Sequence, residues 1–357
     1  MIILAKILNH SFFSGKRVLV TGHTGFIGSW LTKCLSMVSA DICGYALDPP
    51  SNPSMFEALG LKSEILDVRG DIRDRNHLRE TIKEFKPEIV FHLAAQPIVL
   101  NSYDEPFETF DTNVTGTVSL LDELRKVKSI ETIIVVTSDK SYRNEEWVYP
   151  YREIDALGGK DPYSASKSCQ DIVVNSFRES YFSNSGVGIS SIRAGNVIGG
   201  GDWADYRIIP DIIRSIVKGE TLKIRNPNSV RPWQHVLEPI SGMLMLAEKM
   251  PNNKEFNSDW NFGPEYYKEV TVKDLAETFI GLWGTGNYVI ETKQEFKEAN
   301  YLRLDVSKAK GMLSWSPKYT FNTAAKNTVD WYKEYYSNKT NIVKITEDQI
   351  KNYFFIS

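Results

Sequence analysis

Short apolar runs alternate with amphipathic stretches along the first half of the chain. Near-continuous apolar segments of strand length stand at residues 16–22, 41–48, 88–95 and 131–138. Such runs are typical of strands that are buried on both faces of a sheet. Between them, residues 26–39, 75–85 and 106–127 carry apolar side chains at the i, i+3, i+4 spacing of a helix. Repeated strand–helix–strand order predicts an α/β fold with a parallel, doubly wound sheet of the Rossmann type.

The regular alternation of strand-like and helix-like segments ends at about residue 195. A glycine cluster at 195–201 is followed by shorter elements, a helix-like stretch at 238–250 and another near 323–335. We expect a dinucleotide-binding domain over residues 1–195 and a smaller α/β substrate domain, mainly over residues 196–357. No low-complexity linker separates the two halves, so the boundary is soft and the second half is free to return strands to the main sheet.

Charge and cysteine content exclude several classes of function. The 357 residues include 42 Lys and Arg against 45 Asp and Glu, with no long run of one sign, which argues against nucleic acid or a membrane surface as partner. The apolar opening is short and interrupted by Lys6, so we expect no membrane span or signal peptide. The three cysteines lack metal-binding spacing. A cytoplasmic protein without a metal is therefore predicted.

The segment "VTGHTGFIG" places three glycines between the first predicted strand and the first predicted helix. A glycine turn lets a ligand approach the backbone closely, and the helix start offers free N–H groups, so this segment predicts a phosphate cradle rather than a plain turn. The residues expected to line the cradle are Gly22, Thr24, Gly25, Phe26, Ile27 and Gly28.

Asp48 ends the second predicted strand, twenty positions after Gly28. A carboxylate at this place hydrogen-bonds the ribose 2′-hydroxyl of NAD and repels a 2′-phosphate, so NAD is the expected cofactor. The alternative is a turn aspartate before two prolines. Asp71 and Ile72, at the end of a third predicted strand, are candidates for contact with adenine.

Tyr163 and Lys167 stand four residues apart at the start of a predicted helix. That spacing brings both side chains to one helix face, about 6 Å apart along the axis. An ammonium beside a phenol lowers the phenol's pKa from about 10 toward neutrality, which would make Tyr163 a base. The pair alone is not specific, but here it follows a cofactor cradle and the strand-end Ser138.

The segments TGHTGFIG, LAAQ, TSDK and YSASK together resemble the extended short-chain dehydrogenase/reductase family. Within that family the chain is similar to the nucleotide-sugar 4,6-dehydratases, most closely those that act on CDP-glucose. The resemblance covers nearly the whole chain and includes "RAGNVIGGGDWA", "RPWQHV" and "YLRLDVSKAKGMLSWSP". It implies a lyase that removes water from a sugar nucleotide through transient reduction of NAD, in deoxysugar and O-antigen biosynthesis.

The resemblance implies a role for each catalytic candidate. Tyr163 takes the proton from the sugar 4-hydroxyl, Lys167 holds the nicotinamide ribose, and Ser138 hydrogen-bonds the reacting oxygen. Asp139 lies where the family has the acid for water loss. Lys140 lies where the dTDP-glucose branch has a glutamate base, which leaves two alternatives: a lysine of lowered pKa that removes the C5 proton, or a cation that stabilises the enolate.

The resemblance also assigns further binding residues. Asn113 is implied to bend a helix beside the cofactor, and His235 either contacts the nucleotide or caps a loop. Arg231 is expected to bind the pyrophosphate through its fork of donors. His92 is expected to be a hydrogen-bonded core histidine. The remaining candidates are Leu93, Ala94 and Ala95 for the cofactor and Gln96 and Asn196 for the substrate.

Several functions share these features. A dehydratase for dTDP-glucose or GDP-mannose has the same fold, and a 4-epimerase shares Ser138, Tyr163 and Lys167 but needs no acid for water loss, so Asp139 discriminates against it. A cofactor-binding module without catalysis would not need these three side chains. The family resemblance also implies a homodimer or homotetramer, paired through the helices that contain Asn113 and Tyr163.

Overall fold

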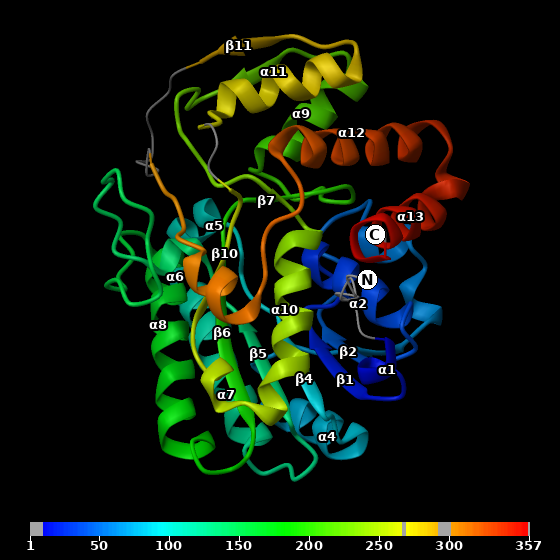
Figure 1. The fold of residues 1–357 in the computed structure, drawn as a ribbon. Helices are drawn as coiled ribbons and strands as arrows, with labels where there is room; N and C mark the ends of the chain where they lie inside the picture. The colour runs from blue at the N-terminus through cyan, green and yellow to red at the C-terminus, as the bar shows by residue number, and fades with distance from the viewer. Residues whose placement is uncertain (1–9, 266–268, 292–300, 356–357) are drawn as a thin grey trace, which may run out of the picture.

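The computed structural model describes residues 10–265, 269–291 and 301–355. Its centre is a seven-stranded sheet in which every pair of neighbouring strands is parallel (Figure 1). In spatial order the strands are β10 (Trp260–Phe262), β6 (Gly188–Ala194), β5 (Thr132–Val136), β4 (Ile89–His92), β1 (Arg17–Thr21), β2 (Asp41–Ala46) and β3 (Leu66–Arg69). The predicted Rossmann sheet is confirmed.

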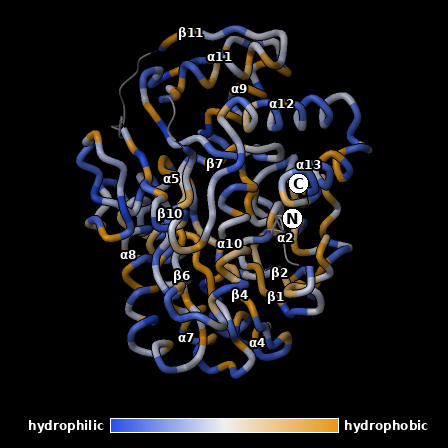
Figure 2. The backbone as a smooth tube through the Cα atoms, in the orientation of Figure 1, coloured by the Kyte–Doolittle hydropathy of each residue, from blue (hydrophilic) through white to orange (hydrophobic). Residues whose placement is uncertain are grey.

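Helices cover both faces of this sheet, and each face has its own apolar core. Successive side chains of a strand point to opposite faces, so Val18 and Val20 of β1 join one core while Leu19 joins the other. Figure 2 shows the hydrophobic segments that run along the central strands. The α-helices are α1 (His10–Phe13), α2 (Phe26–Ser36), α3 (Met55–Ala58), α4 (Arg75–Phe85), α5 (Val99–Asp104), α6 (Pro106–Phe110), α7 (Gly116–Leu124), α8 (Pro162–Phe177), α9 (Ile208–Lys218), α10 (Leu237–Lys249), α11 (Val272–Trp283), α12 (Phe321–Ser337) and α13 (Ile342–Phe355).

The second half of the chain builds a cap beyond the carboxyl ends of the strands. In Figure 1, α9, α11 and α12 lie together above the sheet. Two small parallel sheets join this part, namely β7 (Val197–Ile198) with β9 (Gln234–His235) and β8 (Leu222–Ile224) with β11 (Tyr288–Ile290). The chain also returns to the main sheet, because β10 pairs with β6. The division at residue 195 stays a prediction.

The predicted helix over residues 106–127 is interrupted. Between α6 and α7 the chain forms a π-helical turn over Asp111–Thr115, labelled η2. The buried Asn113 lies in this turn, and its side chain binds outside its own helix. Its Oδ1 accepts from the backbone N–H of Gln96 at 2.8 Å, and its Nδ2 donates to Ser166 Oγ at 2.9 Å. These bonds hold the bend and tie α8 to the loop after β4.

No helix within the described part of the chain is both long and apolar enough to span a bilayer.

Candidate active site

The glycine segment after β1 forms the expected cradle. Gly22 has φ +75°, and a Cβ there would lie 2.7 Å from the backbone nitrogen of Ala94. A Cβ on Gly28 would lie 2.2 Å from the carbonyl oxygen of Gly22. Both positions therefore need glycine, because the backbone of the turn approaches its neighbours too closely for any side chain. At the start of α2, no side chain caps the helix at Gly25, so the first N–H groups remain available to an anion.

Residues on neighbouring strands fix this cradle. The Thr24 hydroxyl donates to the carbonyl of Leu47 at 3.0 Å, and the N–H of Ala94 donates to Thr21 Oγ1 at 3.3 Å. Leu93 donates its N–H to the carbonyl of Thr21 at 3.0 Å. Phe26, Ile27, Ala94 and Ala95 are half-buried. The arrangement fits the pyrophosphate of a dinucleotide at the carboxyl edge of a parallel sheet.

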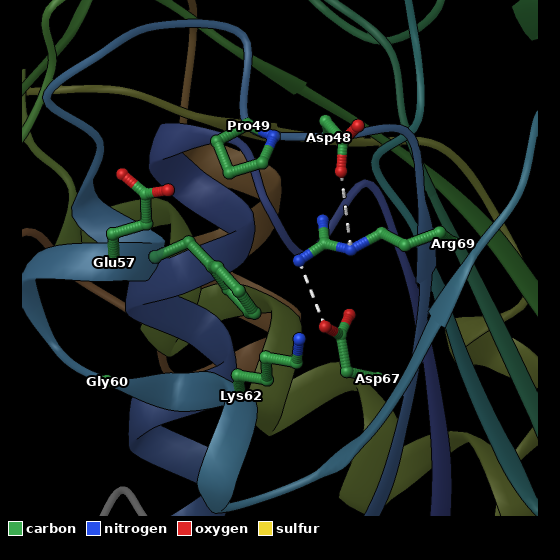
Figure 3. Close-up of a pocket in the computed structure, with 8 residues that line it drawn as sticks. Asp48, Pro49, Glu57, Gly60, Lys62, Asp67 and Arg69 are labelled. Atoms are coloured by element: carbon green, nitrogen blue, oxygen red, sulfur yellow. Dashed lines mark hydrogen bonds and ion pairs between the residues drawn. The ribbon is translucent and has the colours of Figure 1, made fainter.

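Asp48 lies at the rim of a cavity of about 490 Å³ (Figure 3). Its carboxylate is 92% exposed and lies 3.8 Å from Nε of Arg69, at the end of β3. Arg69 is held in place by three further contacts. It donates to Asp67 Oδ2 at 2.9 Å and to the carbonyl of Leu47 at 3.0 Å, and its guanidinium lies 4.8 Å from the centre of the Phe56 ring. Asp48, the carboxylate that is expected to bind the ribose, thus has Arg69 as a neighbour.

Asp71 and Ile72 are both engaged by protein groups. The Asp71 carboxylate binds the side chain and the N–H of Arg73, and the hydrogen bonds from Arg73 lower the pKa of this carboxyl. The Ile72 side chain is 4% exposed and packs where Gly116 leaves space. Contact of either residue with adenine stays a prediction.

Tyr163 begins α8 beside the end of β5. Pro162 opens the helix and Asp161 caps it by accepting from the N–H of Ser164 at 2.9 Å. The Tyr163 ring is 8% exposed. Burial raises the pKa of Tyr163 to about 12, while a hydrogen bond with Ser138 acts in the opposite direction. The pKa of Tyr163 is therefore raised rather than lowered toward neutrality as expected, because desolvation dominates.

Lys167 is also buried, and its ammonium is bound by other groups. Its Nζ donates to Gln170 Oε1 at 2.8 Å and to the carbonyl of Val136 at 3.3 Å. Desolvation lowers the pKa of Lys167 to about 8, and the charge of Asp171 acts against this shift. The lysine is thus directed along its own helix and toward β5.

Asp139 is a buried carboxyl whose pKa lies above the ordinary value. It is 3% exposed, Oδ1 accepts from the Ser138 hydroxyl at 3.1 Å, and no described residue donates to Oδ2. Burial raises the pKa of Asp139, while the charges of Lys140 and Arg231 act in the opposite direction. Lys140 Nζ lies 6.0 Å from the centre of the Tyr163 ring. Ser138, Asp139, Lys140 and Tyr163 are therefore brought together.

The predicted substrate residues are placed differently from one another. Arg231 is buried near Asp139, and its Nη1 donates to the carbonyl of Val230 at 3.0 Å. Asn196 is half-buried between β6 and β7. The Gln96 side chain donates to Thr109 Oγ1 on α6 at 2.8 Å.

His235 takes the geometry of a capping residue. Its imidazole is fully buried between Trp30 and Tyr319, and Nδ1 accepts from the N–H of Leu237 at the start of α10. This is the loop-capping alternative, and burial lowers the pKa of His235 to about 3.

Three residues near the site were not expected from the sequence. Arg69 is adjacent to Asp48 only through the pairing of β2 with β3, so no local pattern reveals it. Arg207, ion-paired with Asp202 at 3.0 Å, acts on Tyr163 by its charge. Gln170 lies three positions after Lys167, and this i, i+3 spacing was a usable signal.

The parallel sheet, the glycine cradle, the paired Ser138 and Tyr163 and the buried Lys167 define an enzyme of the extended short-chain dehydrogenase/reductase class. A model of the family described as GDP-mannose 4,6 dehydratase matches residues 19–328, and the chain belongs to this family.

A relative from Salmonella typhimurium, named CDP-glucose 4,6-dehydratase, is 47% identical over 91% of this chain and 93% of its own length. Solved structures share the fold. The dTDP-glucose 4,6-dehydratase of Bacillus anthracis, in complex with NAD, has a TM-score of 0.75 at 24% identity over 90% of this chain and 97% of its own. The UDP-glucose 4-epimerase of Thermotoga maritima has a TM-score of 0.78 at 24% identity over 90% and 100%.

Proposed function

We propose that this chain is an NAD-dependent lyase that converts CDP-D-glucose to CDP-4-dehydro-6-deoxy-D-glucose and water. The observation that carries the reaction type is the buried Asp139, a carboxyl of raised pKa beside Ser138 and Tyr163. The choice of CDP-glucose is supported by the 47% identity to the Salmonella typhimurium dehydratase.

The residues of the cradle fit NAD. Gly22 and Gly28 leave the backbone open for a pyrophosphate, and Asp48 offers an exposed carboxylate to a ribose hydroxyl. NAD held by these residues would supply the hydride chemistry, namely the removal of a hydride from sugar C4 and its return to C6. The protein's own part in the first step is proton removal from the 4-hydroxyl by Tyr163, with Ser138 hydrogen-bonded to the reacting oxygen. Lys167 supplies positive charge that stabilises the phenolate.

Water loss is assigned to Asp139 and Lys140. A 4-ketone acidifies the C5 proton, and departure of the C6 hydroxyl then needs an acid. Asp139 suits this role because burial favours its protonated form. Lys140 follows directly and serves the C5 step, either as the acceptor of the proton or as the cation beside the enolate. Arg231, whose charge acts on Asp139, is our candidate for binding the substrate's pyrophosphate.

The test is incubation of the purified protein with CDP-, dTDP-, GDP- and UDP-sugars, scored by mass spectrometry for loss of one water. We expect CDP-glucose alone to lose water at a high rate. Preference for dTDP-glucose or GDP-mannose would reassign the substrate, and conversion to an isomer of unchanged mass would indicate a 4-epimerase. The Tyr163→Phe variant is the matched control, because it keeps the ring but removes the base.

We also propose a cytoplasmic homodimer or homotetramer that serves deoxysugar and O-antigen biosynthesis. Assembly through α6 and α8 is supported by large apolar side chains exposed on them, with Phe107 at 81% and Ile172 at 56%. Light scattering of the purified protein measures the number of subunits.

A further inference from the structure

A buried chain of hydrogen bonds runs from Lys167 to the cofactor cradle. Lys167 Nζ donates to Gln170 Oε1 at 2.8 Å, and Gln170 Nε2 donates to Thr117 Oγ1 at 2.8 Å. Thr117 Oγ1 also lies 2.9 Å from His92 Nε2, and His92 Nδ1 lies 2.7 Å from Thr21 Oγ1. Besides Lys167, this series of hydrogen bonds contains four side chains, and each is fully buried: Gln170, Thr117, His92 and Thr21.

The number of protons that each group carries determines which atom donates and which accepts in every one of these hydrogen bonds. Thr117 Oγ1 lies 2.7 Å from the carbonyl oxygen of Asn113 in η2, and a carbonyl can only accept. The single hydroxyl proton of Thr117 is therefore committed, and its two remaining neighbours must donate to it. The Gln170 side chain must present its NH₂ group to Thr117, and His92 must carry its proton on Nε2. His92 Nδ1 then accepts from the Thr21 hydroxyl.

The orientation of the Gln170 amide determines which of its atoms faces Lys167. With its NH₂ group bound to Thr117, Gln170 has only Oε1 to offer Lys167, and a flipped amide would present N–H groups to an ammonium. Among the described residues, the charged or titratable groups that interact with the Lys167 ammonium are Asp171 on α8 and His92 on β4. His92 is neutral because burial, and then the charge of Lys167, lowers its pKa to about 3.

We propose that Gln170 is a positioning residue for the reaction: Oε1 holds the Lys167 ammonium at the end of β5, beside the carbonyl of Val136, and Thr117 and His92 lock the Gln170 amide in the one orientation that can do so. The kinetic part of this proposal rests on the proposed function, because it is there that Lys167 acts on the phenol. The structural part does not, since it concerns hydrogen bonds between the protein's own side chains.

The first test follows the protonation of Lys167 through the NMR signals of His92, because the charge of Lys167 acts on the His92 ring. The chain has five histidines, so ¹⁵N-histidine labelling gives few signals, and the His92→Asn variant assigns the one required. We expect His92 to show the Nε2–H tautomer and a titration step that follows Lys167. Gln170→Glu places a carboxylate at this position and should raise the midpoint by about 1–3 pH units. Gln170→Met has similar size but no acceptor, and should lower the midpoint by about 1 unit.

A second pair of variants tests the lock on the amide. Thr117→Val keeps the volume but removes the hydroxyl, so the Gln170 amide is free to flip and the midpoint should fall as in Gln170→Met. Thr117→Ser keeps the hydroxyl and should restore the wild-type midpoint. Gln349→Met is the matched control, because Gln349 is a buried glutamine on α13 that donates to the carbonyl of Asn327. It should leave the His92 titration unchanged.

The kinetic test uses CDP-glucose. We expect Gln170→Met to lower kcat about 10- to 100-fold with KM unchanged, because a displaced lysine slows the chemical step while Gln170 is too deeply buried to contact substrate. An Nδ1–H tautomer of His92, or the same midpoint in Gln170→Glu and Gln170→Met, would overturn the proposal. Inactivity of the wild-type protein on CDP-glucose would overturn the proposed function instead, and the titration would still decide the role of Gln170.

Discussion

Asp48→Ala is expected to change the cofactor preference because of the neighbour that the structure gives Asp48. In the wild-type protein the Asp48 carboxylate lies 3.8 Å from Arg69 Nε and faces solvent. The carboxylate attracts a ribose hydroxyl, repels a 2′-phosphate and neutralises part of the Arg69 charge. Its removal leaves Arg69 held by Asp67, Leu47 and Phe56, with the guanidinium available to a phosphate.

The size of the change follows from these contacts. A hydrogen bond to a charged group contributes about 1.5–3 kcal/mol, so NAD should bind about 10- to 100-fold more weakly. Two unit charges about 4 Å apart in water interact with about 1 kcal/mol. Lost repulsion and the gained attraction of Arg69 should therefore tighten NADP binding about 10-fold. The ratio of the two affinities should shift by about 10²–10³.

Isothermal titration of the cofactor-free protein with NAD and NADP, at one fixed salt concentration, measures both affinities. The double variant Asp48→Ala with Arg69→Gln should lose the gain in NADP binding while keeping the weakened NAD binding. Asp41→Ala is the matched control, because Asp41 is an exposed aspartate at the start of β2, the strand that ends two residues before Asp48. An unchanged NAD to NADP ratio in Asp48→Ala would place the ribose contact elsewhere. A gain in NADP binding that survives loss of Arg69 would refute the role of the arginine.

Three further outcomes are expected. Tyr163→Phe should keep NAD bound but abolish its reduction when CDP-glucose is added, and persistent nicotinamide reduction would remove Tyr163 from the role of base. Asp139→Asn and Lys140→Ala should each slow water loss about 10²–10⁴-fold, so that NADH absorbance rises and stays high. Wild-type rates of water loss in these variants would contradict the assignment of this step to Asp139 and Lys140. Burial raises the pKa of Glu238 from 4.5 to about 7, so this carboxyl contributes stability below pH 4.5 that is lost as pH rises through 7. Between pH 5 and 8 this group should lower the unfolding free energy of the wild-type protein by about 2 kcal/mol. Urea unfolding should show a smaller decrease in Glu238→Gln. An equal decrease in both proteins would be evidence against a raised pKa of Glu238.

The sequence alone predicted those features that depend on short spacings. Apolar runs and amphipathic stretches predicted the parallel sheet, because burial on two faces demands continuous apolar strands. The cradle around Gly22 and Gly28 was predicted for a similar reason, since a close turn before a helix needs glycine at fixed offsets. Tyr163 and Lys167 share a helix face by spacing alone.

Only the tertiary structure decided which distant residues meet and how their charges behave. Arg69 reaches Asp48 because β2 and β3 pair in parallel, and the chain from Lys167 through Gln170 and Thr117 joins α8 and α7 to His92 on β4. The pKa of Tyr163 is raised rather than lowered, because desolvation depends on everything that packs around a side chain rather than on one neighbour in sequence. Periodicity within a segment is a local property that the sequence carries by itself, whereas burial and long-range contact arise only when the segments are packed together.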